Sequence, residues 1–285
     1  MAIRDREVDP DATVEESRTN METLLSIFKV AEDIVCTPVD AGGIPAEWVV
    51  APEADDDRVI LYLHGGGYVM GSINTHREMV SHISRAAKAK VLIIDYRMGP
   101  ENPFPAAVED ATAAYNWLLD QDVDPSKTVI AGDSAGGGLS VATLVTLKGQ
   151  KSPLPAAAVC LSPWVDLEMT GESMITQAES DPLVQKETLI KLAAAYLNGA
   201  DARTPRASPI YADLSGLPPM LITVGTAETL YDDATRLAEN AKSAGVAVTL
   251  EIGEELTHVW QIYAALARES KDSMESIGQF IRQHT

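Results

Sequence analysis

Short apolar runs alternate along this chain with stretches that have helical periodicity. Strand-like runs rich in β-branched residues occupy residues 47–51, 59–63, 91–95, 128–131, 156–161, 220–224 and 246–252. Helical patterns separate most of them, at residues 75–88, 106–120, 135–148, 229–243 and about 259–283. This alternation is typical of βαβ units around a mostly parallel sheet. Because α/β architectures often use this length for one core, we expect a single domain over residues 1–285.

Two segments do not follow the alternation: about residues 1–45 and residues 165–208. The second lies between two predicted strands and is too long for a plain crossover, so we expect the two segments to form a helical cap. The first segment has apolar residues at the helical spacing i, i+3, i+4, i+7, which would place them on one face of a helix: Met21, Leu24, Leu25 and Phe28. This apolar face could pack on the helices of the sheet or roof a pocket, and one helix can do both.

Charge narrows the range of partners. The chain has 22 basic and 42 acidic residues and a net charge of −20, which would repel phosphate backbones and anionic lipid headgroups. We therefore expect neither a nucleic acid nor a membrane as partner. The amino-terminal residues lack the apolar stretch of a signal peptide, and no later window resembles a membrane span, so a cytoplasmic location is predicted.

The cysteine content does not suggest a disulfide framework. Cys36 and Cys160 are the two cysteines and lie far apart in the sequence. Cys160 falls in an apolar run with the pattern of a buried strand. A packed thiol is the expected state of such a residue.

The sequence GDSAG at residues 132–136 carries the strongest chemical signal, because it directly follows a predicted strand and directly precedes an apolar helix. A serine on so sharp a turn projects its hydroxyl into open space, and the positions two before and two after it must lack side chains. Gly132 and Gly136 meet that requirement, which makes Ser134 a candidate nucleophile. A glycine-rich turn with an idle serine is the alternative. A phosphate-binding loop is disfavoured because no lysine follows the glycines.

The sequence HGGGY at residues 64–68 follows the predicted strand 59–63. Acyl transfer builds negative charge on the carbonyl oxygen, and rigid N–H donors aimed at that oxygen stabilise it. Adjacent glycines allow two backbone N–H groups to approach one oxygen without obstruction. The N–H of Ala135, at the positive end of the following helix, would be the third donor. We expect His64 to be structural and to bond the backbone of its loop.

A serine nucleophile needs a base with a pKa near neutrality, which indicates a histidine. The chain has five: His64, His76, His82, His258 and His284. The first precedes the glycine loop, the next two lie in a predicted helix, and the last is penultimate in a terminus that is expected to fray. His258 follows the last predicted strand on a loop, at the carboxyl edge of the sheet where open α/β folds place their sites. It is therefore the predicted base.

The acid that orients the histidine is expected after the strand 220–224, where three carboxylates occur. Glu228 comes first after the strand end and is the favoured candidate. Asp232 and Asp233 fall in the first turns of the next helix, where acidic residues are common because they favour the helix dipole. The order Ser134, Glu228, His258 matches the chain order of hydrolases on this fold.

From about Val59 to its end, the chain resembles the bacterial hormone-sensitive-lipase family of esterases. The motifs that carry the resemblance are HGGGY (64–68), DYRMGPENPFPAAVED (95–110), GDSAGG (132–137), SPWVDL (162–167), DPLV (181–184), GTAETLYDDA (225–234) and His258. The family usually has Asp where this chain has Glu228, and histidine where it has Asn102. Neither departure removes a reacting group.

The resemblance implies an α/β-hydrolase fold with an eight-stranded sheet and a helical cap. It also implies an oxyanion hole from Gly66, Gly67 and Ala135, and a homodimer formed through an edge strand. The implied activity is the hydrolysis of short-chain acyl esters, which are small-molecule substrates, without a cofactor or metal ion.

We therefore predict a serine carboxylesterase. A lactone hydrolase or a metabolite acetyl hydrolase could use the same triad. The alternative from another class, a non-catalytic ligand receptor on this fold, is disfavoured because Ser134, His258 and the three glycines are all present.

Overall fold

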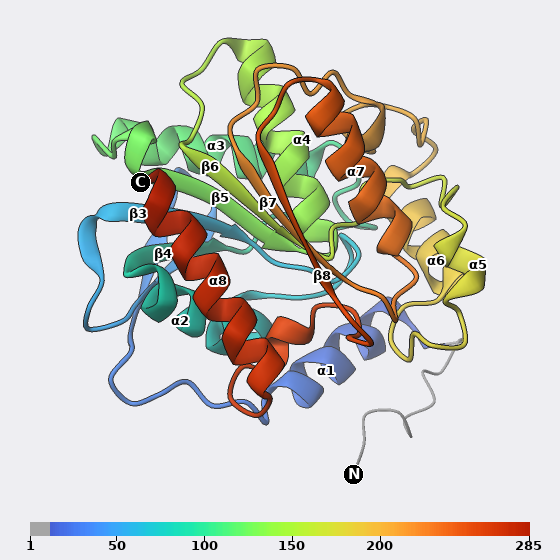
Figure 1. Cartoon of the computed structure of the whole chain (residues 1–285), viewed down its shortest axis with the longest axis horizontal. Helices are drawn as coiled ribbons and strands as arrows, with labels where there is room; N and C mark the ends of the chain where they lie inside the picture. Colours follow the sequence, from blue (N-terminus) through green and yellow to red (C-terminus); the bar gives the residue numbers. More distant parts are fainter. Residues whose placement is uncertain (1–11) are drawn as a thin grey trace.

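An eight-stranded sheet runs through the middle of the computed structural model, which describes residues 12–285 (Figure 1). Its strands are β1 (Val35–Asp40), β2 (Pro45–Val50), β3 (Asp55–Leu63), β4 (Ala89–Ile94), β5 (Thr128–Asp133), β6 (Ala157–Leu161), β7 (Met220–Gly225) and β8 (Val248–Gly253). They lie in the order β1-β2-β4-β3-β5-β6-β7-β8. Strand β2 is antiparallel to both of its neighbours, and the other pairs are parallel. The predicted mostly parallel, eight-stranded α/β fold is confirmed.

Strand β1 differs from the pattern-based prediction, which found the other seven strands and included residues 35–45 in the cap. The strand pairs with β2 from Val35 opposite Val50 to Asp40 opposite Pro45. None of its residues is buried, so no run of core-facing apolar residues marks it in the sequence. Residues 35–40 therefore belong to the sheet, and residues 1–11 of the predicted cap lie outside the described part of the chain.

Helices cover both faces of the sheet (Figure 1). The α-helices of the described chain are α1 (Val14–Leu25), α2 (Ile73–Ala87), α3 (Ala106–Asp120), α4 (Ala135–Gln150), α5 (Ser173–Thr176), α6 (Lys186–Leu197), α7 (Tyr231–Ser243) and α8 (Arg268–His284). Core residues of α2 and α8 pack on one face, and those of α3, α4 and α7 pack on the other. This covering explains why the central strands are apolar on both sides. In β3, for example, Ile60 and Leu61 point to opposite faces and both are fully buried.

The last helix begins later than the periodicity predicted. A left-handed residue, Val259 with φ 48°, and a short 3₁₀ helix (Trp260–Tyr263) separate His258 from α8. A side-chain-bearing residue in the left-handed region is unfavourable within an α-helix, so the chain cannot run as one helix from residue 259. As a result, His258 stands on a loop and not in a helical first turn.

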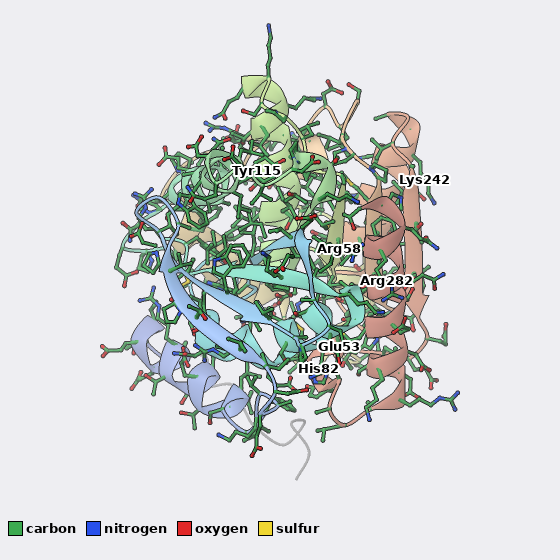
Figure 2. All side chains as sticks on the ribbon, turned by 90° about the vertical axis from the view of Figure 1, so that its left-hand side faces the viewer. Glu53, Arg58, His82, Tyr115, Lys242 and Arg282 are labelled. Atoms are coloured by element: carbon green, nitrogen blue, oxygen red, sulfur yellow. The ribbon has the colours of Figure 1, made fainter. Side chains whose placement is uncertain are left out.

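Arginines attach the last helix to the rest of the domain (Figure 2). Arg58 of β3 donates a 2.7 Å hydrogen bond to the side chain of Thr285, which follows α8. Arg282 of α8 donates to the main-chain carbonyl of Ala86 in α2. Both hydrogen bonds join the carboxyl-terminal end of the chain to elements that lie much earlier in the sequence.

The two cysteines behave as packed thiols. Cys160 of β6 is fully buried, Cys36 of β1 is partly buried, and both are free. Burial raises the pKa of Cys160 to about 12, so this thiol stays protonated and unreactive at neutral pH. Within residues 12–285, none of the helices has the length and apolarity needed to cross a bilayer.

Close packing of α8 on α2 predicts an unusual response to mutation at Gly278. A Cβ at this position would lie 2.3 Å from the carbonyl oxygen of Ala86. Helix propensity alone would favour alanine by about 1 kcal/mol. Backbone atoms cannot yield cheaply, however, and overpacking costs about 1–3 kcal/mol. We therefore expect Gly278→Ala to lower the free energy of unfolding.

The matched control is Gly149→Ala near the end of α4, where a Cβ would meet nothing within 4 Å. This substitution is expected to raise the free energy of unfolding by about 0.5–1 kcal/mol. The free energy of unfolding of both variants is measured by urea denaturation followed by circular dichroism. Stabilisation by Gly278→Ala equal to that by Gly149→Ala would contradict the packing argument.

Candidate active site

Ser134 is the single residue between the end of β5 and the start of α4. Its φ of 52° and ψ of −121° lie in a region that residues with side chains rarely occupy. A Cβ on Gly132 would lie 2.3 Å from the carbonyl oxygen of Gly136, and one on Gly136 would lie 1.9 Å from that of Leu63. The turn can therefore close only with glycine at both positions, as the sequence predicted.

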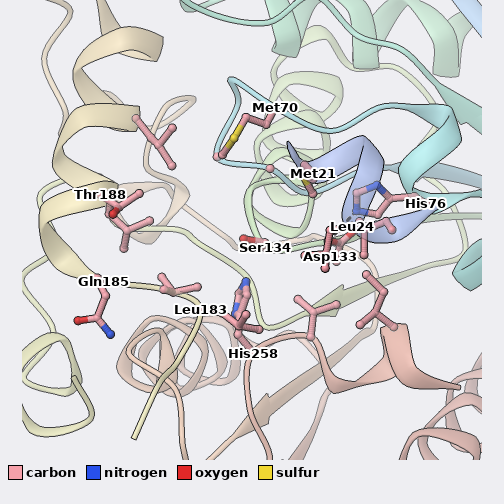
Figure 3. A pocket seen from close by; sticks show the side chains of 18 of the residues that line it. Met21, Leu24, Met70, His76, Asp133, Ser134, Leu183, Gln185, Thr188 and His258 are labelled. Carbon is pink, nitrogen blue, oxygen red and sulfur yellow. Dashed lines mark hydrogen bonds and ion pairs between the residues drawn. The ribbon is translucent and has the colours of Figure 1, made fainter. Parts of the chain in front are cut away.

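A pocket of about 230 Å³ lies over this turn and is lined by both Ser134 and His258 (Figure 3). Its wall is mostly apolar. Helix α1 contributes Met21, Leu24 and Leu25, and α6 with the residues before it contributes Leu183, Leu189 and Leu192. The apolar face of α1 therefore lines the pocket, which answers the question that its sequence left open. Beyond the end of α1, Phe28 packs edge-on against Tyr263, with ring centroids 6.1 Å apart.

Glu228, the favoured acid, contacts the predicted base directly. Nδ1 of His258 lies 2.8 Å from Oε2 of Glu228, and the carboxylate is fully buried. The other carboxylate oxygen accepts hydrogen bonds from the Ser162 hydroxyl, at 2.9 Å, and from the Gly225 main-chain N–H. This set of donors fixes the carboxylate in one orientation, so the imidazole is held with Nδ1–H toward Glu228 and Nε2 outward.

Ser162 is a member of this site that the sequence analysis did not identify. Its hydroxyl donates to Glu228 and accepts a 3.1 Å hydrogen bond from the main-chain N–H of Val259. It therefore positions both the acid and the loop that carries His258. Ser162 belongs to the SPWVDL motif, but nothing in the residue pattern there indicates a contact with a side chain 66 positions later.

The environment of His258 favours its charged form. Burial by itself would lower the pKa of the imidazole, but the hydrogen bond and negative charge of Glu228 outweigh it. The pKa of His258 is therefore raised above its ordinary value. A buried ion pair of this kind makes the imidazole a stronger proton acceptor.

The two aspartates that remained as alternative acids bind elsewhere. Asp232 accepts a 2.9 Å hydrogen bond from the main-chain N–H of Ser173. Asp233 accepts from the main-chain N–H groups of Val165 and Asp166, both at 2.9 Å. Burial raises the pKa of Asp233 to about 8, so at neutral pH this carboxyl group is mostly protonated. Among the three candidates, only Glu228 contacts His258.

The Ser134 hydroxyl makes no hydrogen bond to any other group within residues 12–285. It lies in the same pocket as His258, and in Figure 3 the imidazole ring is directed toward Ser134. Hydrogen bonds between a nucleophile and its base are often long in the absence of substrate and tighten when substrate binds. The hydroxyl is therefore free to be engaged by the outer nitrogen of His258.

Three main-chain amides near Ser134 are also free. Within the described chain, the N–H groups of Gly66, Gly67 and Ala135 donate no hydrogen bond to a protein acceptor. Ala135 is the first residue of α4, so its N–H is one of the donors that a helix leaves unpaired and carries the positive end of the dipole. Gly66 has φ 116°, and a Cβ there would lie 2.3 Å from the carbonyl oxygen of Met70, so only glycine fits. These donors can receive an anion.

Asp133 ties the glycine loop to the serine turn. Its Oδ1 accepts hydrogen bonds from the Gly65 N–H at 3.0 Å and from the Tyr62 hydroxyl at 2.8 Å, and its Oδ2 lies 3.3 Å from Nε2 of His76. Burial alone would raise the pKa of Asp133, but His76 and the Tyr62 hydroxyl more than offset it and hold the pKa below its ordinary value. The residue pattern predicted only a helix at His76 and indicated no role for Asp133.

The other histidines have structural partners. His64 donates from Nδ1 to the Gly65 carbonyl at 2.8 Å and stacks on Tyr96, in agreement with its predicted role. Burial lowers the pKa of His64 to about 3, so the ring is neutral. His82 pairs with Glu78, and His284 bonds the carbonyl of Phe280. Within residues 12–285, no group of three His, Cys, Asp or Glu side chains is arranged to hold a metal ion.

Comparison with known proteins agrees with this architecture. Residues 60–262 match a family model described as the alpha/beta hydrolase fold. An acetyl-hydrolase of Streptomyces hygroscopicus is 48% identical over 87% of this chain and 82% of its own length. An esterase of Acinetobacter venetianus is 32% identical over 92% of this chain and 87% of its own length.

Solved structures point to the same family. An esterase from the bacterial hormone-sensitive lipase family superimposes with a TM-score of 0.97 at 52% identity, over 99% of this chain and 95% of the other. A hormone-sensitive lipase from a metagenome library superimposes with a TM-score of 0.93 at 41% identity, over 96% and 94% of the two chains. The chain therefore belongs to the bacterial hormone-sensitive-lipase-like esterases of the alpha/beta hydrolase family, and it is a carboxylic ester hydrolase.

Proposed function

We propose that this esterase works by a serine mechanism in which Ser134 is the nucleophile, His258 its base and Glu228 the orienting acid. The observation that carries the proposal is the buried Glu228–His258 pair, 2.8 Å apart, whose imidazole lines the same pocket as the strained Ser134, beside three free main-chain amides. Each of these features contributes a different part of ester hydrolysis.

In the first half-reaction, Nε2 of His258 takes the proton of Ser134 while Oγ attacks the ester carbonyl carbon. The negative charge of Glu228 stabilises the imidazolium that forms. The amides of Gly66, Gly67 and Ala135 donate to the oxyanion, where rigid donors are worth most. The imidazolium then protonates the alcohol oxygen, the carbon–oxygen bond breaks, and Ser134 remains acylated.

In the second half-reaction, His258 takes a proton from water as the water attacks the acyl carbonyl. The same amides hold the second oxyanion. Ser134 Oγ is then the leaving group and recovers a proton from the imidazolium. The carboxylic acid is released, and every group returns to its starting state without a metal or cofactor.

We also propose that the substrates are short-chain acyl esters and that α1 and residues 165–208 act as a cap over the site. Residues of α1 and α6 line a pocket of about 230 Å³, which is below the range of typical ligand sites, about 300–1,000 Å³. The relative described as an acetyl-hydrolase supports small acyl groups. It also keeps acetyl ester hydrolysis of a metabolite as the second candidate, with the same residues acting.

Removal of the nucleophile tests the mechanism. Ser134→Ala is expected to lower kcat for p-nitrophenyl butanoate by at least about 10⁴-fold, because the residual rate then comes from the amides and binding alone. Ser126→Ala, which changes an exposed serine, is the control and should retain wild-type kcat. The kcat of the wild type and of the two variants is measured from the steady-state release of p-nitrophenol. Comparable turnover by Ser134→Ala would exclude this nucleophile.

The acid assignment has a signature in the pH profile. Because Glu228 raises the pKa of His258 and the neutral imidazole is the active form, the acid limb of kcat/KM should lie above the ordinary histidine pKa of about 6.5. In Glu228→Gln the stabilising charge is gone and burial dominates. We expect the limb to move to lower pH and kcat to fall roughly 10³- to 10⁴-fold.

Asp232→Asn is the matched control for Glu228→Gln, since it also neutralises a carboxylate near the same helix start. It should leave the acid limb in place and change kcat by less than about tenfold, as expected for a group outside the reacting set. The profiles are measured with p-nitrophenyl acetate between pH 5 and 9. Collapse of Asp232→Asn with near-normal Glu228→Gln would reverse the assignment.

Acyl length tests the pocket. Across p-nitrophenyl acetate, butanoate, hexanoate and dodecanoate, kcat/KM should be highest among the first three and fall at least about tenfold for dodecanoate, as its extra methylenes find no buried surface. Leu192→Ala enlarges the pocket wall beside Gly67 and should shift the preference to longer chains. Leu266→Ala removes a side chain that is 73% exposed and should not. Identical profiles for the two variants would disprove the limit.

A further inference from the structure

We propose that Arg18 is a positioning residue that holds α1 against the turn at residues 66–70, which carries the amides of Gly66 and Gly67. Helix α1 is called the roof here because its side chains line the pocket that contains Ser134. Through this link, Arg18 determines how strongly the enzyme discriminates between acyl chains of different length. This inference rests on the proposed function for its kinetic consequence, but its structural half can be tested without turnover.

The Arg18 guanidinium reaches from α1 to two separate loops. Nε donates to the main-chain carbonyl of Val69 at 2.8 Å, and Nη2 donates to that of Gly99 at 2.9 Å. Nη1 and Nη2 also bind the two carboxylate oxygens of Glu101, at 2.9 and 2.8 Å. Four donors of one planar group are thus used at once, in a fork that a lysine ammonium cannot reproduce.

Val69 belongs to the turn that shapes the glycine loop. The main-chain N–H groups of Val69 and Met70 both donate to the carbonyl of Gly66, at 3.2 and 2.8 Å. This carbonyl belongs to the same peptide as the N–H of Gly67, so its position fixes that donor. Arg18 therefore acts on the turn through Val69.

A second route leads from Arg18 to the same turn. The carbonyl of Gly99 accepts from Arg18, and the main-chain N–H of Gly99 donates to the carbonyl of Tyr68 at 2.9 Å. Arg18, the 99–101 loop and the 66–70 turn therefore close a ring of hydrogen bonds. A change at Arg18 is expected to loosen both sides of this ring together.

Helix α1 has few other attachments. None of its residues is buried, and its apolar side chains Met21, Leu24 and Leu25 line the pocket and not the core. Besides the Arg18 fork, Glu22 accepts a hydrogen bond from Ser72, and Phe28 beyond the helix end packs on Tyr263. Helix α1 also packs against α2, but the Arg18 side chain is the one that bonds the main chain of the 66–70 turn, at Val69, within the described residues.

The expected kinetic effect depends on acyl length. An acyl chain long enough to reach Met21, Leu24 and Leu25 binds against the roof, whereas an acetyl group next to Ser134 does not extend that far. If α1 shifts, the apolar surface offered to butanoate and hexanoate is reduced, and KM rises for those esters. If the 66–70 turn loosens as well, kcat falls for every ester, because the oxyanion donors are common to all.

Four variants separate these effects. Arg18→Met removes every donor, Arg18→Lys keeps the charge without the fork, and Glu101→Gln keeps the two carbonyl contacts but removes the ion pair. Arg268→Met is the control, because it removes an arginine that is 88% exposed and whose ion-pair partner, Asp272, lies on its own helix. Hydrogen exchange of residues 14–25 and 66–71 is measured for each, followed by kcat and KM for acetate, butanoate and hexanoate esters.

Arg18→Met should speed exchange at least tenfold in both segments, raise KM for hexanoate at least fivefold more than for acetate, and lower kcat about equally for all three esters. Arg18→Lys should not rescue these changes. Glu101→Gln should speed exchange in α1 more than in the turn. Arg268→Met should match wild type.

Unchanged exchange in the 66–71 segment of Arg18→Met would overturn the coupling, even if α1 loosened. A uniform rise in KM that is independent of acyl length would overturn the role in discrimination. Failure of the proposed mechanism has a different signature, since Ser134→Ala would then keep turnover while the exchange results could still support the link.

Discussion

The close approach of the β5–α4 turn to the end of β3 is the constraint on which the rest of the site depends. The carbonyl of Leu63 lies where a Cβ of Gly136 would be, so the two strand ends can meet only because that position lacks a side chain. This contact puts Ser134 beside the glycine loop that leaves β3. Asp133 then bonds Gly65 and Tyr62, which locks the loop to the turn. The proposed nucleophile and the proposed amide donors are therefore positioned by one packing contact, before any substrate binds.

The second half of the site arrives from the far end of the chain by a different interaction. Strand β7 is parallel to β6 and β8 is parallel to β7, so the loops after β7 and β8 carry Glu228 and His258 to the same edge of the sheet as the end of β6. Ser162, just after β6, bonds both the Glu228 carboxylate and the Val259 main chain. Three strand ends thus share one buried polar cluster. A buried carboxylate is costly unless it is fully hydrogen-bonded, and here every oxygen of Glu228 has a donor.

Local rules predicted much of this arrangement. Periodicity located seven strands and the main helices, because central strands buried on both faces and helices packed on a sheet have strong apolar patterns. The serine turn, the glycine loop, His258 and Glu228 follow from chemistry tied to strand ends. Contacts between distant side chains, those of Ser162, Asp133 and Arg18, have no local pattern and were not predicted. Strand β1 was not predicted because it is an edge strand with no buried residue, and such a strand lacks the apolar pattern that marks the central strands.

The central claim is that the acyl group passes through Ser134. Rapid acid quench of the enzyme with p-nitrophenyl butanoate, followed by peptide mass spectrometry, tests it most directly. We predict that the peptide containing residues 132–137 gains the mass of one butanoyl group, and that Glu228→Gln and His258→Ala reduce its rate of formation. A butanoyl group on another side chain, or full turnover with no acylated peptide, would contradict the account.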